Sequence, residues 1–131
     1  MRRSKDWLDQ AMRDLEHARA SIELGHFEWS CFAAQQAAEK AIKAVFEDMG
    51  AVAWGHSAVD LLQELSQHHA ATDELMQGAY ELDKAYIPAR YPNAHPSGSP
   101  RQRFTREEAT RLVTHAHGIV DFCARLLSPA D

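Results

Sequence analysis

Apolar residues recur every three or four positions along most of the chain, which is the spacing of one face of an α-helix. The first such segment covers residues 4–24 and ends before Gly25, a residue type that commonly terminates helices. Its apolar stripe consists of Trp7, Leu8, Ala11, Leu15, Ala18 and Ile22. Charged residues lie off this stripe, so the pattern predicts an amphipathic helix with one face on a core.

The second segment, residues 28–49, has apolar and small residues on more than one face. Two neighbouring stripes can be traced: Cys31, Ala34, Ala38, Ile42, Val45 and Met49 in one, and Trp29, Phe32, Ala33, Ala37, Ala41 and Ala44 in the other. A helix with so wide an apolar surface must be covered on several sides. The pattern therefore predicts either the central helix of a bundle or a helix that packs in a dimer.

Helical spacing returns in three further segments, at 57–69, at 72–87 and at 105–127, the last of which opens with a capping-box signature. Prolines interrupt the chain repeatedly between the last two segments, so no helix crosses that region. No segment alternates apolar and polar residues as strands do. The chain is therefore predicted to be one all-α domain, residues 1–131: an antiparallel bundle of about five helices with a proline-rich loop before the last.

Composition and net charge limit the kinds of function that the chain can have. The chain has 131 residues and a net charge of −5, which suits one domain and argues against a broad surface for long nucleic acids. The net charge does not exclude a local basic site that binds one phosphate or a short nucleic-acid strand. Cys31 and Cys123 fall within apolar helical patterns and are expected to be buried thiols.

Several familiar kinds of site and targeting signal are missing from the sequence. The eight histidines show no metal-ligand spacing, and no glycine-rich phosphate loop occurs, so neither a metal nor a cofactor is expected. The charged N-terminus is not followed by an apolar signal segment, and no apolar run approaches the roughly 18 residues of a membrane span. We therefore expect a cytoplasmic protein without a membrane partner.

The loop at residues 89–96, with the sequence Ala-Arg-Tyr-Pro-Asn-Ala-His-Pro, carries the strongest candidates for chemistry. Arg90 is a permanent cation whose planar donor fork suits phosphate, and His95 can exchange a proton near neutral pH. Together they are a minimal set for metal-free RNA cleavage, with His95 as general acid or base and Arg90 stabilising the phosphorane charge. Asp83 or Asn93 could orient the imidazole of His95.

A purely structural interpretation of the same region is also open. In it Arg90 pairs with Asp83 or Glu81, and Tyr91 anchors the loop on the bundle. Elsewhere, Glu39 and Lys43 have the spacing of an ion pair on a solvated helix face. The neighbouring glutamines 35 and 36 lie among alanines, and a buried glutamine needs hydrogen-bond partners from a dimer seam or a nearby loop.

Several segments, in order along nearly the whole chain, resemble the HEPN domain (higher eukaryote and prokaryote nucleotide-binding). They are Trp7 with Ala11 and Leu15, Ala33–Lys43, Gly55–Ser57, Leu82–Asp83 and Tyr86–Pro92. The resemblance implies an up-and-down helical bundle that commonly forms homodimers. Many members are encoded beside a minimal nucleotidyltransferase in two-gene systems of toxin–antitoxin type, which makes such a protein an expected partner.

The resemblance also implies a first hypothesis for the activity, RNA cleavage. Ribonuclease members carry an arginine and a histidine with four to six residues between them, paired across the dimer into one composite site. Arg90 and His95 match this motif with four residues between them. Tyr91 departs from the polar residue that usually follows the arginine in these members.

The second hypothesis is a non-catalytic module that binds a nucleotide or a nucleotidyltransferase. In this case Arg90 and Lys40 or Lys43 would contact phosphates. Tyr86 or Tyr91 would stack on a base. The acidic net charge favours this hypothesis and the arginine-to-histidine spacing favours the first, so the sequence leaves both open.

Overall fold

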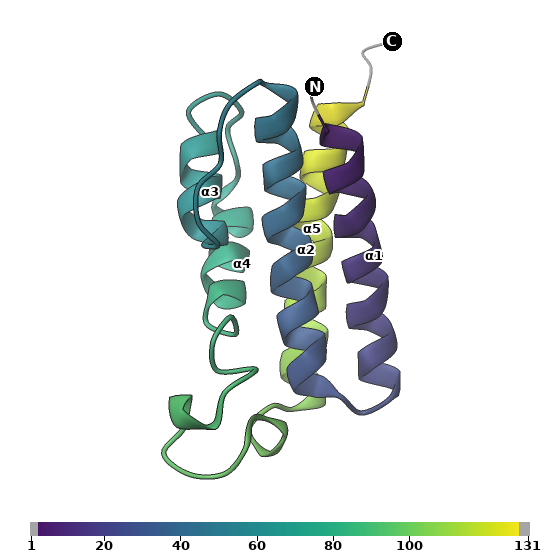
Figure 1. Cartoon of the computed structure of the whole chain (residues 1–131), viewed down its shortest axis with the longest axis vertical. Helices are drawn as coiled ribbons and strands as arrows, with labels where there is room; N and C mark the ends of the chain where they lie inside the picture. Colours follow the sequence, from purple (N-terminus) through teal and green to yellow (C-terminus); the bar gives the residue numbers. More distant parts are fainter. Residues whose placement is uncertain (1–2, 129–131) are drawn as a thin grey trace.

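A computed structural model describes residues 3–128 of the chain. Its five α-helices are α1 (Ser4–Glu23), α2 (Phe27–Asp48), α3 (Ala58–Leu65), α4 (Asp73–Asp83) and α5 (Arg106–Leu127), with short 3-10 helices η1 (Pro92–Ala94) and η2 (Pro100–Gln102). The part of the chain described contains no β-strand. Figure 1 shows α1, α2 and α5 side by side, with α3 and α4 on the other side of α2 from α1. The predicted all-α bundle is confirmed.

Helix α2 is the central element of this bundle. Between residues 30 and 46 its only side chains that are not buried are Phe32, Gln36, Lys40 and Lys43, which lie along one narrow stripe. Its other faces pack against α1, α5 and the α3–α4 pair. The wide apolar surface seen in the sequence is therefore covered within a single chain, and a dimer is not needed to explain it.

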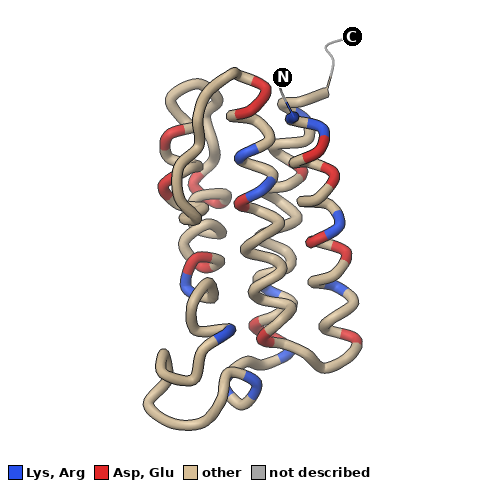
Figure 2. Tube along the Cα trace, in the orientation of Figure 1, with Lys and Arg blue, Asp and Glu red and all other residues tan. Residues whose placement is uncertain are grey.

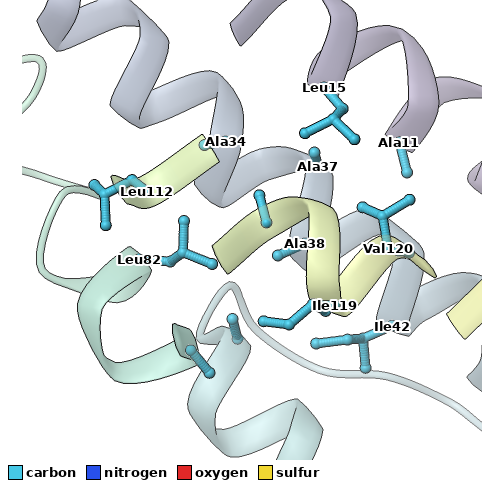
Figure 3. Close-up of a cluster of buried hydrophobic side chains, with 14 of the residues drawn as sticks. Ala11, Leu15, Ala34, Ala37, Ala38, Ile42, Leu82, Leu112, Ile119 and Val120 are labelled. Carbon is cyan, nitrogen blue, oxygen red and sulfur yellow. The ribbon is translucent and has the colours of Figure 1, made fainter. Parts of the chain in front are cut away.

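Alanines bring the long helices close together around α2. Ala37 and Ala38 are both fully buried. Figure 3 shows Ala37 on the side of α2 that faces Leu15 of α1, and Ala38 on the side that faces Ile119 of α5. A methyl side chain at these positions lets neighbouring helices approach closely while the larger residues on α1 and α5 fill the space between them.

Helix α4 ends four residues earlier than predicted, at Asp83 instead of 87. The chain continues through tighter turns, in which the amide of Tyr86 donates to the carbonyl of Asp83 and that of Arg90 to the carbonyl of Ile87. Pro88 explains the change, because it has no amide hydrogen for the α-helical bond and disfavours helical geometry in the residue before it. The backbone that carries Arg90 is consequently a set of turns beside α2.

Helix α3 is also shorter than the predicted segment 57–69 at both ends. Ser57 is its N-cap and not a helical residue, since its hydroxyl accepts a hydrogen bond from the amide of Asp60 at 3.0 Å. The final helix begins as its capping signature predicted, with the Thr105 hydroxyl accepting from the amide of Glu108 at 3.1 Å.

Both cysteines are buried free thiols, as predicted. Burial raises the pKa of Cys31 and of Cys123 to about 12. Because the thiolate is the reactive form, neither side chain is a nucleophile near neutral pH.

Residues 3–128 contain neither a metal-binding cluster nor a membrane span. No group of three or more His, Cys, Asp or Glu side chains in this range is placed to hold a metal ion. None of its helices combines the length and the apolar character needed to cross a bilayer.

Candidate functional site

A buried polar network connects α2 with the start of α3 and the end of α4. At its centre is Gln35, whose side chain is fully buried. Its Nε2 donates to the carbonyl oxygen of His56 at 2.8 Å and to Oδ1 of Asp83 at 3.2 Å. The hydrogen-bond partners expected for a buried glutamine therefore come from the loop before α3 and from α4, within the same chain.

The carboxylate of Asp83 caps helix α3. It accepts hydrogen bonds from the Ser57 hydroxyl at 2.8 Å and from the amides of Ala58 and Val59 at 2.9 and 3.0 Å. The first amides of a helix have no partner within the helix and carry partial positive charge, so a carboxylate is well suited to this position. Asp83 thereby fixes the end of α4, and the turns that follow it, to the rest of the bundle.

The predicted ion pair between Glu39 and Lys43 is present, with Nζ and Oε2 3.1 Å apart. It does not lie on a solvated face, however, since only 5% of the Glu39 side chain and 13% of the Lys43 side chain are exposed. The loop before α3 brings the His56 Nδ1 to 3.4 Å from the Glu39 carboxylate, and the Lys43 ammonium lies 5.8 Å from the centre of the Trp7 ring on α1. Lys40, in turn, pairs with Asp14 of α1. Both lysines proposed as phosphate ligands are thus engaged by carboxylates.

Arg90 lies among aromatic rings. Its guanidinium carbon is 4.4 Å from the centre of the Phe32 ring, 4.6 Å from that of Tyr86 and 5.0 Å from that of Tyr91. Its Nε donates to the carbonyl oxygen of Tyr86 at 2.9 Å. The ring of His56 stacks on Tyr86, with centroids 5.6 Å apart and planes 16° apart. We call Phe32, Tyr86, Arg90 and Tyr91 the Arg90 cluster.

No ion pair within residues 3–128 includes Arg90. Of the two carboxylates considered as its partners, Asp83 caps α3, and Glu81 lies 3.8 Å from Arg111. The structural interpretation of Arg90 as an ion-pair residue is therefore wrong. Its cation is positioned by ring faces and one carbonyl, which leaves the terminal nitrogens of the planar fork for an anionic ligand.

His95 is held in a different way. Its Nε2 lies 2.7 Å from the carbonyl oxygen of Pro88, and its ring meets Phe104 edge-on. Since a carbonyl only accepts, Nε2 carries a proton, and in the neutral form of this imidazole Nδ1 is an acceptor. The backbone thus orients this imidazole, and the expectation that Asp83 or Asn93 does so is wrong, because Asp83 is committed to α3 and Asn93 is exposed on η1.

The imidazole of His95 lines a cavity of about 280 Å³ between the turns after α4 and the start of α5. The lining residues are Glu81, Lys84, Ala85, Pro88, His95, Arg103, Phe104, Glu108 and Leu112. Arg90 is not among them, since its side chain faces Phe32 on α2. Within one chain, the two residues of the proposed catalytic pair therefore have separate surroundings.

The proline-rich loop around His95 is well supported by hydrogen bonds. Arg103 donates to the carbonyl and the hydroxyl of Ser97, at 2.7 and 2.5 Å. Gly98 between them has a φ of +77°, and a Cβ there would lie 2.8 Å from the Gln102 amide oxygen. Only glycine combines this backbone conformation with the close approach. The loop holds His95 in a defined place.

Sequence reasoning missed two members of this region. In the sequence Phe32 belongs only to an apolar stripe and His56 only to a segment of the family resemblance, yet in the structure Phe32 contacts Arg90 and His56 stacks on Tyr86. Charge is consistent with a local site here, because residues 84–106 contain five Lys or Arg and no Asp or Glu. Along the rest of the chain trace Lys and Arg are interspersed with acidic residues (Figure 2). The sequence feature that could have revealed the role of Phe32 is its i, i+4 spacing with Gln36 and Lys40. These three residues form the stripe on which α2 meets solvent.

Comparison with known proteins gives one family match. The model of the HEPN domain matches residues 4–126. No curated protein matches the chain.

Three solved structures are similar over nearly their whole length. The protein TT1696 from Thermus thermophilus is 46% identical, with a TM-score of 0.92 over 95% of this chain and 98% of that one. A HEPN domain protein from Thermotoga maritima is 52% identical, with a TM-score of 0.79 over 95% and 99% of the two chains. The archaeal HEPN homologue ST0689 is 34% identical, with a TM-score of 0.82 over 98% and 100%.

Proposed function

The chain belongs to the HEPN domain family, and we propose that it is the phosphate-recognising component of a two-gene system of toxin–antitoxin type. In this proposal the protein is a homodimer, and its protein partner is a minimal nucleotidyltransferase. The dimer and this partner follow from the family resemblance. The proposed ligand is a nucleotide or the end of an RNA strand, and Arg90 is the residue that binds its phosphate.

A single observation carries this proposal: a partly buried arginine, held by three aromatic rings, has no carboxylate partner among the described residues. The rings fix the guanidinium plane before a ligand arrives, so little side-chain freedom is lost when the ligand binds. Because bulk water is partly excluded by the rings, hydrogen bonds from the guanidinium to a phosphate are stronger than at an open surface. The net charge of −5 agrees with recognition of one phosphate and not of a long polyanion.

The affinity for AMP tests this assignment. We expect Arg90→Ala to weaken AMP binding about 30-fold, because removing a charge-assisted pair of hydrogen bonds costs about 2 kcal/mol. Isothermal titration calorimetry measures the effect. Arg90→Lys keeps the charge but loses the planar fork, and an intermediate affinity is expected.

Arg101→Ala is the matched control, because it removes the same charge from an exposed position in η2. Its affinity for AMP should equal that of the wild type. The assignment is wrong if wild-type protein does not bind AMP, or if Arg90→Ala binds it as tightly as Arg101→Ala does.

A second candidate function is metal-independent RNA cleavage, and the geometry of His95 favours it. With Nε2 donating to Pro88, Nδ1 of the neutral imidazole is an acceptor that can take the proton of a 2′-hydroxyl. Arg90 does not line the His95 cavity, so a composite site would combine Arg90 of one protomer with His95 of its partner.

This candidate makes a prediction that separates a composite site from a site within one chain. Wild-type protein should cleave RNA in the presence of EDTA, and Arg90→Ala and His95→Ala should each be inactive. If Arg90 of each protomer acts with His95 of its partner, the dimer holds two equivalent sites. Mixing the two inactive variants under conditions of subunit exchange should then restore about a quarter of the activity, because half of the dimers hold one intact site of the two. Gel analysis of a labelled RNA measures this, with His68→Ala as an exposed-histidine control. Intact RNA after incubation with wild-type protein would rule the candidate out.

A further inference from the structure

A second pocket adjoins the Arg90 cluster, between the lower halves of α1 and α2 in Figure 1. Its volume is about 230 Å³, and it is lined by Asp14, His17, Trp29, Phe32, Ala33, Gln36 and Lys40. Ligand pockets commonly measure roughly 300–1,000 Å³, so this one suits a single flat ring system and not a larger molecule.

Two aromatic side chains form the apolar wall of this pocket. Trp29 and Phe32 meet edge to face, with ring centroids 6.2 Å apart and planes 79° apart. Trp29 keeps 48% of its surface exposed although it belongs to the central helix of the bundle. An indole that is half exposed at the rim of a pocket offers its flat face for stacking, and such stacking accepts any aromatic base.

Phe32 joins the pocket to the proposed phosphate site. Its ring lines the pocket, and the guanidinium carbon of Arg90 lies 4.4 Å from its centre. A ligand that occupies both places therefore has an anionic group at Arg90 and a flat ring beside Trp29. A nucleotide has this composition, with a phosphate and a base joined by one sugar.

Gln36 gives the pocket a hydrogen-bond preference. Its amide nitrogen donates to the Gln35 amide oxygen at 2.8 Å and to the Glu39 carboxylate at 3.4 Å. Both of its hydrogens are thereby directed away from the pocket, which leaves its Oε1 as the group that meets a ligand. Lys40 is paired with Asp14 on the facing helix and adds no net charge. Gln36 therefore contributes a hydrogen-bond acceptor to the wall of the pocket, beside the donors of Lys40.

We propose that this pocket binds the nucleobase of the ligand whose phosphate Arg90 binds, and that it selects a base with an exocyclic amino group, such as adenine. Trp29 stacks on the base, and Gln36 Oε1 accepts a hydrogen bond from the amino group. The proposal rests on the function proposed above and adds to it the site and the identity of the base.

Three probes test the base site separately from the phosphate site: AMP, IMP and ribose 5-phosphate. We expect AMP to bind about tenfold more tightly than ribose 5-phosphate, which is the range of one stacked base. IMP has a carbonyl where AMP has its amino group, so it should bind more weakly than AMP. Calorimetry gives the affinities, and quenching of tryptophan fluorescence reports on stacking.

Trp29→Ala should weaken AMP binding about tenfold and leave the affinity for ribose 5-phosphate unchanged. Trp29→Phe keeps an aromatic ring and should retain most of the affinity, and the melting temperature of both variants verifies folding. Trp54→Ala is the matched control, because Trp54 is 82% exposed and lies outside the pocket.

Each remaining outcome overturns a stated part of the proposal. Equal affinity for AMP and ribose 5-phosphate, both dependent on Arg90, removes the base site and leaves the proposed function standing. Equal affinity for AMP and IMP removes the selection of an amino group by Gln36. If none of the three probes binds, the proposed function is wrong and the base site is wrong with it.

Discussion

The Asp83→Ala variant is expected to lose about 3 kcal/mol of its free energy of unfolding. The Asp83 carboxylate accepts hydrogen bonds from two amides and the hydroxyl at the start of α3, and from the amide of Gln35. Alanine would remove the cap of α3 and one of the partners of a fully buried glutamine. Urea denaturation followed by circular dichroism measures the loss, and the melting temperature should fall by about 10 °C.

Asp60→Ala is the control for this experiment. Asp60 lies in the first turn of the same helix but is exposed, and the change removes the same charge. Its expected cost is at most about 1 kcal/mol, the range of a surface charge near a helix end. Similar losses in the two variants would show that the Asp83 hydrogen bonds add nothing beyond charge. Since Asp83 also positions the turns that carry Tyr86 and Arg90, its replacement should weaken AMP binding at temperatures where the protein is still folded.

The second large effect is expected for Ala37→Leu, again about 3 kcal/mol of lost stability. Ala37 is fully buried on the side of α2 that faces α1, where Leu15 and Ala11 occupy the space across the contact (Figure 3). The extra carbon atoms would force α1 and α2 apart or push side chains out of their preferred rotamers. Urea denaturation measures this loss as well.

Ala20→Leu adds the same atoms on the exposed side of α1 and serves as the control. Its stability should stay within about 0.5 kcal/mol of the wild type. If Ala37→Leu were equally mild, the contact between α1 and α2 would have room that the buried alanines do not indicate, and the account of α2 as a tightly packed central helix would be wrong.

Much of the candidate site could be located from the sequence, although its chemistry could not. Arg90, Tyr91 and His95 are candidates in the sequence because prolines restrict the loop that carries them, and because arginine suits phosphate and histidine exchanges a proton near neutral pH. The partners of these residues could not be found in this way. Arg90 forms no ion pair with Asp83 because that carboxylate caps another helix, and His95 is oriented by a backbone carbonyl, which no side-chain motif reveals.

The interpretation of Glu39 and Lys43 illustrates the same limit. Their i, i+4 spacing correctly predicted an ion pair, because two residues on one helix are neighbours whatever surrounds that helix. The spacing did not predict that the pair is nearly buried. His56 of the loop before α3 and Trp7 of α1 lie against it, and contacts with distant segments leave no periodic trace in the helix.

The sequence by itself determined the helices, the wide apolar surface of α2, the capping of α5 and the HEPN family, because each depends on residue types within one or two turns or on their order along the chain. Only the tertiary structure decided what the polar residues do. It places the Asp83 carboxylate at the start of α3, Phe32 against Arg90, and Trp29 beside a pocket between α1 and α2. These contacts join segments that are far apart in the chain, and they form only when the core packs, so no local pattern specifies them.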